Sequence, residues 1–416
     1  MESVLRKLGV TGLTTSPGAE PDVLVDATAL DSDHRTRGIG RYVGNLVRAI
    51  EDIRPESPNV GYLRLGGPLQ ELARLGRESA DVPGASEAAK PGRSSTLQRP
   101  PGPHLSRWIL NEWRLAEELD GRCEIYHGTE PAAIPVSDSF KTVVTCHDVI
   151  PLMFPDVYLR FPYVFWRLYY RRLRQTGRWG DIDHVIAISE ATKRELLRHF
   201  DIEPERISVV HNGIDHEQFQ PVEDERSIRG FCAEWELEKP FILYLGGYDY
   251  RKNVDVLIRA LPHVPDEVDL VLAGGVYSGD RRRMEELADS LGVGDRIRFP
   301  GYVDDEVLCE LYAAAEVFAY PSLAEGFGLQ LLEAMAVGCP VVASNRSSLP
   351  EVVGDAGLLV DPEDPKMIGE ALRRCVDDEE TRRRLEVDGR ERAKEFSWRR
   401  TAEETIAVYR KVLRSS

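Results

Sequence analysis

Residues 320–345, YPSLAEGFGLQLLEAMAVGCPVVASN, form the stretch that decides the fold of this chain. The hydrophobic pattern in and just before it predicts four successive elements: the end of a strand at 317–320, a loop at 321–328, a helix at 329–337 and a short buried strand at 340–344. Gly338 is placed to close the helix. A glycine-rich loop that follows a strand and opens a helix presents unpaired backbone N–H groups above the sheet. The stretch therefore predicts an α/β fold with a place for an anion.

The same stretch contains two carboxylates that are eight residues apart. Glu325 falls in the predicted loop and Glu333 on the second turn of the predicted helix. Both side chains can therefore face one cleft without touching each other. On spacing alone, a solvated loop residue and an exposed helix position explain the pair equally well.

Length and charge limit the classes of protein to consider. At 416 residues with 42% hydrophobic content, the chain is too long for one core and suits two domains. The formal net charge of -17 argues against nucleic acid as a main partner, since phosphate backbones are bound by clustered Lys and Arg.

The six cysteines and the hydropathy indicate the cellular compartment. No Cys-x-x-Cys pair occurs, which predicts reduced, mostly buried thiols without a zinc site or disulfide. We see no apolar run long enough to span a membrane and no signal-peptide core. We therefore expect a cytoplasmic protein.

The amino-terminal half begins as a parallel α/β sheet. A strand at 22–27 is followed by a turn with Gly38 and Gly40 that opens a helix. This turn lacks the third glycine of a dinucleotide fingerprint, so taken alone it favours a plain tight turn over a ligand-binding loop. Further strands are expected at 124–128, 142–146, 183–189 and 207–212, with a helix at 190–200 capped by Ser189. His127 and His147 stand at the ends of two of these strands, at the edge where open α/β sheets bind ligands.

Two segments of this half have open interpretations. Residues 76–104 have no apolar period, which predicts a mobile insert that is either dispensable or a lid on the acceptor side. Residues 161–179 mix aromatic side chains with arginines. Such a helix lies on an anionic membrane surface, or it packs its rings on the sheet while the arginines reach water.

The carboxyl-terminal half starts a second sheet after a charged, irregular hinge at 220–238. Strands are expected at 241–245, 269–275 and 297–303, and helices at 304–315 and 396–416. Arg251 and Lys252 stand where a loop enters a helix, so two cations and a helix amino terminus converge. The predicted domains are residues 1–222, completed by the helix at 396–416, and residues 236–395.

Taken together, the motifs resemble the retaining glycosyltransferases of family 4 (group 1), and within it the mannosyltransferase-like branch. The resemblance rests on EGFGL at 325–329, Glu333, GCPVVAS at 338–344, GIGRY at 38–42, HDVIP at 147–151, HNGID at 211–215, the RKN block at 251–253 and LPEVVG at 349–354. It covers nearly the whole chain except residues 1–20 and 66–104. It implies the GT-B fold, in which two Rossmann-like, doubly wound parallel-sheet domains face an interdomain cleft.

The resemblance also implies roles for particular residues. Arg251 and Lys252 would neutralise the leaving diphosphate, Glu325 would hold or orient the sugar ring, and His147 would contact its primary hydroxyl. Glu333 would hold the ribose. The expected donor-binding set, named by resemblance, is Gly38, Gly40, Gly247, Tyr302, Val303, Gly326, Phe327, Gly328, Leu329 and Glu333.

The implied reaction is transfer of a hexose from a nucleotide sugar to a glycan or lipid-linked acceptor, with retention by front-face attack. GDP-mannose is the favoured donor, and UDP and dTDP sugars are the alternatives. Neither a metal nor another cofactor is expected, because no Asp-x-Asp is placed as a metal-binding set of strand-end carboxylates, and the nearby candidate, Asp31 and Asp33, precedes a glycine turn in the wrong domain. The enzyme would be cytoplasmic, with peripheral contact to the inner face of the membrane as an option.

Two other functions remain compatible with the sequence. A sugar-nucleotide epimerase of the same fold would need no acceptor, and a non-catalytic sugar-nucleotide-binding protein would need no cations at a leaving group. A dehydrogenase is disfavoured, because no complete Gly-x-Gly-x-x-Gly with a ribose-binding acid is present.

Overall fold

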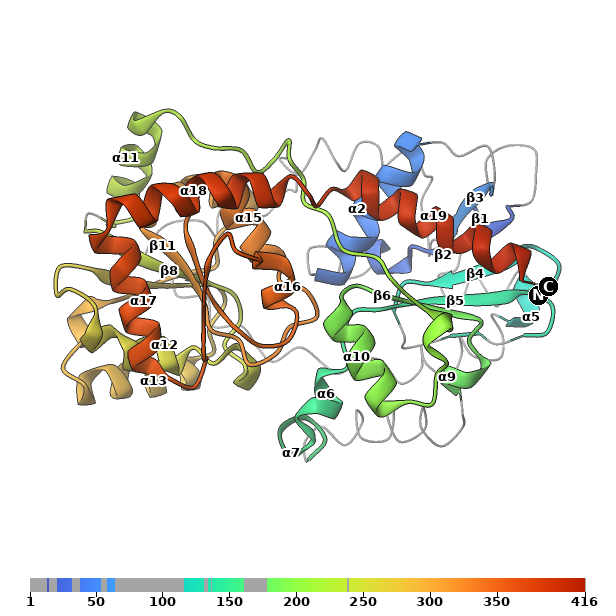
Figure 1. Cartoon of the computed structure of the whole chain (residues 1–416), viewed down its shortest axis with the longest axis horizontal. Helices are drawn as coiled ribbons and strands as arrows, with labels where there is room; N and C mark the ends of the chain where they lie inside the picture. Colours follow the sequence, from blue (N-terminus) through green and yellow to red (C-terminus); the bar gives the residue numbers. More distant parts are fainter. Residues whose placement is uncertain are drawn as a thin grey trace. The chain divides into compact units, whose positions relative to one another are not determined.

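The computed structural model describes residues 13–14, 21–31, 38–53, 58–63, 116–130, 134–135, 137–160, 178–237 and 239–415. The predicted insert at 76–104 and most of the aromatic and basic helix at 161–179 lie outside these residues. The described chain divides into two compact units (Figure 1). Unit 1 contains the described residues up to Gly213 together with those from Trp398 onward, and unit 2 contains Ile214–Ser397.

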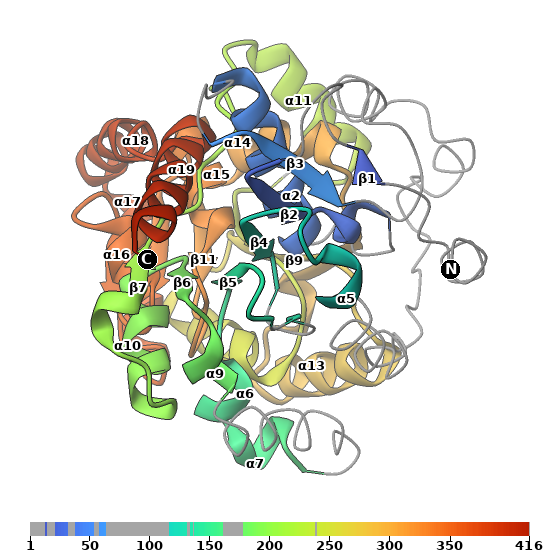
Figure 2. The ribbon, with the colours of Figure 1, turned by 90° about the vertical axis from the view of Figure 1, so that its right-hand side faces the viewer.

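Unit 1 is built on a seven-stranded sheet in the order β1-β3-β2-β4-β5-β6-β7. Its strands are β1 (Leu13–Thr14), β2 (Val23–Asp26), β3 (Val60–Leu63), β4 (Ile125–Gly128), β5 (Lys141–Cys146), β6 (His184–Ala187) and β7 (Ile207–Val209). All neighbouring strands are parallel except the β1–β3 pair. The chain runs from β2 outward to β3 and then returns to β4 on the other side. The carboxyl ends of β2 and β4 therefore flank a topological switch point; Figure 2 shows β2, β4 and β5 side by side.

The helices of unit 1 lie between and after these strands in the chain. They are α2 (Gly38–Ile53), α5 (Ala116–Leu119), α6 (Ile150–Met153), α7 (Pro155–Tyr158), α9 (Arg178–Asp181), α10 (Glu190–His199) and α19 (Trp398–Arg414), with 3-10 turns at Thr28–Asp31 and Pro204–Arg206. The helix α19 lies beside α2 (Figure 1), and both contribute side chains to one core with β2, β4 and β5. The Ser189 hydroxyl accepts from the Thr192 N–H, which confirms the predicted cap of α10.

Unit 2 is built on a six-stranded, fully parallel sheet in the order β10-β9-β8-β11-β12-β13. Its strands are β8 (Phe241–Leu245), β9 (Asp269–Ala273), β10 (Ile297–Gly301), β11 (Val317–Tyr320), β12 (Val341–Ser344) and β13 (Leu358–Val360). In chain order this is the 3-2-1-4-5-6 arrangement of a doubly wound sheet. Its switch point lies between the carboxyl ends of β8 and β11. The chain continues from β8 into the loop with Arg251 and Lys252, and from β11 into the loop at 321–328.

The helices of unit 2 connect these strands. They are α11 (Glu225–Glu234), α12 (Asp255–Ala260), α13 (Ser278–Ser290), α14 (Leu308–Ala314), α15 (Leu329–Val337), α16 (Leu349–Val353), α17 (Pro365–Asp377) and α18 (Glu379–Ala393). Four 3-10 turns are added at Tyr250–Lys252, Leu261–His263, Gly294–Arg296 and Asp305–Val307. Gly338 closes α15 in the left-handed region at φ 99°, as predicted.

Two local predictions are wrong. The stretch at 220–238, expected to be irregular, contains α11, which Asp224 caps and Phe231 anchors by burial. Arg251 and Lys252 do not enter a helix directly, because they form a 3-10 turn that Asn253 ends in the left-handed region, two residues before α12. In both places local capping by Asp or Asn decides the structure, and hydrophobic periodicity does not report such caps.

A backbone contact at the carboxyl edge of unit 2 requires Gly274. This residue has φ 123°, and a Cβ there would lie 2.1 Å from the carbonyl oxygen of Gly246. Gly246 opens the loop that carries Arg251 and Lys252, so close packing at Gly274 helps to set the path of that loop.

Gly274→Ala is therefore expected to destabilise the protein by about 3 kcal/mol or more, from backbone strain and overlap together. Urea unfolding of the full chain measures the loss. Gly279→Ala is the matched control, since a Cβ at Gly279 meets nothing within 4 Å at the start of α13. Equal stability of the two variants would contradict this account.

Candidate functional site

The loops after β8 and β11 meet at the switch point of unit 2. Leu323 N–H donates to the Arg251 carbonyl at 2.7 Å, which joins the two loops through the backbone. The Asn253 amide donates to the carbonyls of Pro321 at 3.2 Å and Pro362 at 2.7 Å. An Asn in the left-handed region therefore ties three separate segments together.

Glu325 lies between the two cations that the sequence singled out. Its Oε2 is 2.5 Å from Arg251 Nη1, and its Oε1 is 2.7 Å from Lys252 Nζ. Arg251 Nη1 also donates to the Ala324 carbonyl at 3.3 Å, and half-exposed Asp249 lies 3.4 Å from Arg251 Nε. The structure thus brings together three of the four predicted catalytic residues in a partly buried cluster.

Burial and pairing act in opposite directions on the charges of this cluster. For Glu325, burial opposes the charged form, but the charges of Lys252 and Arg251 outweigh it and lower the pKa to about 2. For Lys252, burial is the largest effect and lowers the pKa of the ammonium, although Glu325 acts against it. Glu325 is therefore an ionised acceptor at neutral pH, and it does not serve as a proton donor.

Tyr320, the last residue of β11, holds Lys252 from a second side. Its hydroxyl accepts from Lys252 Nζ at 2.8 Å and lies 3.2 Å from Gln330 Oε1 on the first turn of α15. The ammonium also lies 4.9 Å from the centre of the Tyr320 ring. In the sequence, Tyr320 marks the end of a predicted strand, and this position at the carboxyl edge of the sheet is the signal for a role in the site.

The loop from Gly326 to Gly328 leads into α15 as predicted. All three residues of this loop are buried, and Gly328 has φ 114°, a conformation that side chains rarely adopt. Gly328 is the N-cap and has no side chain with which to cap the helix, so the first turn from Leu329 offers N–H groups to an anion.

The remaining predicted residues of unit 2 lie on neighbouring elements. Glu333 is buried on α15 and accepts a hydrogen bond from the Tyr312 hydroxyl at 3.0 Å. After β10, Tyr302 is exposed and Val303 is buried. Gly247 is exposed after β8, where its carbonyl accepts from the Tyr244 hydroxyl.

In unit 1, His147 follows β5 and is held in a defined tautomer. Its Nε2 lies 2.9 Å from the Thr129 carbonyl, which can only accept, so Nε2 carries the hydrogen. Burial is the main influence on this imidazole and lowers its pKa to about 4. The neutral ring therefore presents Nδ1 as an acceptor, and the Tyr42 ring packs edge-on against it at 4.8 Å.

A row of buried polar groups stands behind His147. Tyr409 on α19, His127 on β4, Thr145 on β5 and Tyr42 on α2 are linked at 2.6, 2.8 and 3.0 Å. Burial lowers the pKa of His127 to about 3, so this histidine is a neutral structural group. Gly38, exposed, and Gly40, buried, open the same helix α2 that carries Tyr42.

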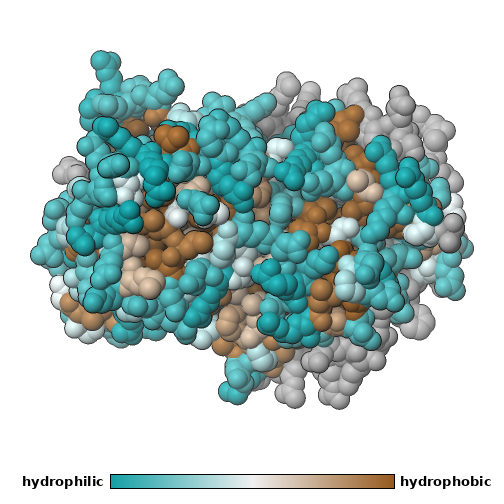
Figure 3. All heavy atoms as spheres, in the orientation of Figure 1, coloured by the Kyte–Doolittle hydropathy of each residue, from teal (hydrophilic) through white to brown (hydrophobic). Residues whose placement is uncertain are grey.

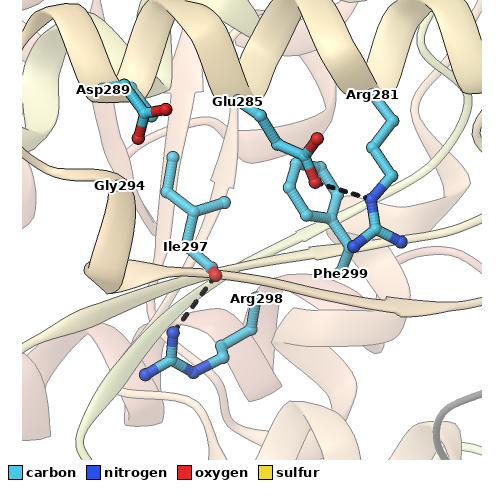
Figure 4. A pocket seen from close by; sticks show the side chains of 8 residues that line it. Arg281, Glu285, Asp289, Gly294, Ile297, Arg298 and Phe299 are labelled. Carbon is cyan, nitrogen blue, oxygen red and sulfur yellow. Dashed lines mark hydrogen bonds and ion pairs between the residues drawn. The ribbon is translucent and has the colours of Figure 1, made fainter.

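A pocket of about 260 Å³ lies elsewhere in unit 2, between α13 and β10 (Figure 4). Its arginines are neutralised, because Arg281 pairs with Glu285 at 2.8 Å and Arg298 with Asp269 at 2.9 Å. It includes Ile297, the first residue of β10, and so lies toward the amino edge of the sheet, away from the switch-point loops. None of the predicted site residues lines it.

The described residues contain neither a metal-binding cluster nor a membrane-spanning helix. No three His, Cys, Asp or Glu side chains among them are arranged to hold a metal ion. Asp31 ends a 3-10 turn, and Asp33 lies outside the described part. None of the described helices has the length and apolar character needed to cross a bilayer. The face in Figure 3 is largely hydrophilic, with smaller hydrophobic areas.

The low pKa of His127 makes stability depend on pH. Its folded pKa of about 3 lies below the ordinary value of 6.5, so the stability is full above pH 6.5 and is lost as the pH falls toward 3. Between pH 7 and 5 this group alone removes about 2 kcal/mol. In urea unfolding, the free energy of unfolding of His127→Asn is therefore expected to fall by about 2 kcal/mol less than that of wild type between pH 7 and 5.

Tyr409→Phe is the control for this experiment, because it removes the hydroxyl partner of His127 and keeps the buried imidazole. We expect it to keep the acid-induced loss of wild type. If His127→Asn loses as much stability as wild type between pH 7 and 5, His127 does not contribute to the acid sensitivity, which then comes from other buried histidines such as His147.

Two family models match most of the chain. Residues 36–218 match the model "Glycosyltransferase Family 4", and residues 232–392 match "Glycosyl transferases group 1". The O-antigen chain mannosyltransferase B of Escherichia coli is 31% identical over 382 residues, which cover 90% of this chain and 96% of that protein. The serotype-specific mannosyltransferase WbdA of Escherichia coli is 29% identical over 95% of this chain. The matched region is 48% of the length of WbdA, so this chain spans about half of that relative.

Solved structures share the fold at lower identity. The sucrose-phosphate synthase of Thermosynechococcus elongatus has a TM-score of 0.68 and 22% identity, with 95% of this chain and 99% of that chain covered. The expected two-domain GT-B fold is thereby confirmed. On the two family models and the full-length relative, the chain belongs to the family 4, group 1 glycosyltransferases, in their mannosyltransferase-like branch.

Proposed function

We propose that this glycosyltransferase moves a hexose, most favourably mannose from GDP-mannose, to a glycan or lipid-linked acceptor with retention of the anomeric configuration. The observation that carries the proposal is the placement of Arg251, Lys252 and Glu325 at the switch point of unit 2. Charged groups of this kind stabilise a leaving diphosphate when they are fixed before the reaction begins.

The two cations are suited to the charge that develops when a sugar–phosphate bond breaks. Glu325 pairs with both cations in the partly buried cluster, and half-exposed Asp249 lies beside Arg251. A bound diphosphate would therefore gain from Arg251 and Lys252 in a medium of lowered dielectric. The N–H groups at the start of α15, after Gly326, Phe327 and Gly328, would add a helix terminus to the same task.

We assign Glu325 to the sugar. Its carboxylate stays ionised, so it can accept hydrogen bonds from sugar hydroxyls while it orients the two cations. Two ion pairs also reduce its strength as a nucleophile, which favours front-face attack over a covalent intermediate. Buried Glu333 would hold the ribose hydroxyls, and the segment at Tyr302 and Val303 would contact the base.

For the first domain we propose that His147 receives a hydroxyl of the donor sugar. Because Nε2–H is committed to Thr129, the lone pair on Nδ1 is the group available to accept. Gly38 and Gly40 would allow the backbone of the neighbouring loop to approach the donor closely.

We further propose that no metal or other cofactor takes part. Arg251 and Lys252, with the start of α15, supply positive charge at the place where a metal would otherwise be needed. The choice of mannose rests on two relatives, which are named as a serotype-specific mannosyltransferase and an O-antigen chain mannosyltransferase. A glycan or lipid-linked acceptor presented at a membrane surface would suit an enzyme that binds peripherally to the membrane.

Arg251→Ala is expected to lower kcat by about 10²- to 10³-fold, or about 2.7–4 kcal/mol, the cost of losing one preorganised donor. The rate is measured at saturating donor, with circular dichroism to check the fold. Arg259→Ala is the control, because Arg259 is exposed on the next helix and should leave kcat unchanged. A near-native rate in Arg251→Ala would remove Arg251 from the mechanism.

The donor is tested by a thermal-shift panel of GDP, UDP, dTDP and ADP. GDP alone is expected to raise the melting temperature strongly, since a ligand at about 100 times its Kd adds about 2.7 kcal/mol to stability. Guanosine, which lacks the diphosphate, is the control and should shift the melting temperature little. A large shift with UDP and none with GDP would overturn the GDP-mannose assignment.

A further inference from the structure

Ser347 has a backbone conformation that its residue type does not favour. Among the described residues, the only non-glycine residues with positive φ are Glu236, Asn253 and Ser347, at 56°, 54° and 60°. Asn adopts this region readily, whereas serine does so less often. Asn253 and Ser347 both bond to the loop that carries Glu325, and Glu236 lies exposed just after α11.

The Ser347 hydroxyl engages Glu325 on both sides of its Cα. The hydroxyl accepts from the Glu325 N–H at 3.2 Å and donates to the Glu325 carbonyl at 2.7 Å. The Ser348 hydroxyl, fully buried, lies 3.0 Å from the same carbonyl and 2.8 Å from that of Phe327. We call these two residues the serine clamp.

The clamp fixes a backbone without touching the reacting charges. Both hydroxyls bond to main-chain atoms, so the Glu325 carboxylate remains directed at Arg251 and Lys252. The preceding part of the loop is held by Leu323 N–H on the Arg251 carbonyl. With both flanks of Glu325 fixed, its side chain starts from one defined position.

We propose that Ser347 is a positioning residue, which with Ser348 holds the Glu325 loop against Arg251 and Lys252. Its left-handed backbone is kept because this conformation brings the hydroxyl to both main-chain groups of Glu325. The expected effect of Ser347 on catalysis rests on the proposed function. Its effect on the Glu325 loop rests on the geometry alone.

Three variants separate positioning from stability. Ser347→Gly removes the hydroxyl and suits positive φ, so its melting temperature should stay near that of wild type. Ser347→Ala removes the hydroxyl and keeps the unfavourable φ, so its melting temperature should fall. Both should lower kcat/KM for nucleotide-sugar transfer by about 10- to 100-fold, as small misplacements of catalytic groups do.

Glu236→Gly is the matched control, because it relieves the same backbone conformation at an exposed residue just after α11, outside the Glu325 loop. It should keep wild-type kcat/KM. A merely structural role for Ser347 would make activity follow stability, so that Ser347→Gly is active and Ser347→Ala is not. That outcome would overturn the proposal.

Hydrogen exchange gives a readout that does not depend on activity. Peptides covering 321–330 should exchange faster in both Ser347 variants than in wild type, and at the wild-type rate in Glu236→Gly. Unchanged exchange in the Ser347 variants would show that there is no clamp, whatever the enzyme does. If wild type transfers no sugar from any nucleotide sugar while exchange responds as expected, the proposed function fails and the clamp stands.

Discussion

The contact of the Glu325 carboxylate with Arg251 and Lys252 is the constraint on which the carboxyl-terminal unit depends. A lysine as buried as Lys252 is costly to keep charged unless an opposite charge and hydrogen-bond acceptors surround it. Glu325 and the Tyr320 hydroxyl supply these, at 2.7 and 2.8 Å. The loops after β8 and β11 must therefore converge, and the parallel sheet places their strands next to each other.

The elements of this architecture could be largely predicted from the sequence, because buried parallel strands appear as short apolar runs and their helices carry an apolar stripe. β8, β11 and α15 were placed at the observed positions. The polar caps that start and end helices were harder to predict from the sequence. An Asp cap starts α11 within a charged stretch, and Asn253 ends a 3-10 turn before α12 can begin. Hydrophobic periodicity does not record either of these features.

The site was predictable in its residue types but not in its pairings. Arg251, Lys252 and Glu325 could be identified from their motifs, yet 74 positions separate Arg251 from Glu325, and only the folded sheet shows that they touch. Ser347 had no signal, since a serine in a loop after a strand predicts neither positive φ nor a bond to a backbone 22 residues away. Its role follows from the fold alone.

The cost of the buried charges argues that the cluster exists for a ligand. Replacing a buried ion pair by apolar side chains of similar volume is often neutral or stabilising, so stability alone does not explain this cluster of buried charges. Burial already lowers the pKa of Lys252, which means that the protein holds this ammonium in a state that more negative charge would improve. In the proposed function, a bound diphosphate would add that charge next to Arg251 and the amino terminus of α15. Under the proposed function, the arrangement would be least favourable when empty and most favourable with the leaving group in place, which is the differential stabilisation that catalysis requires.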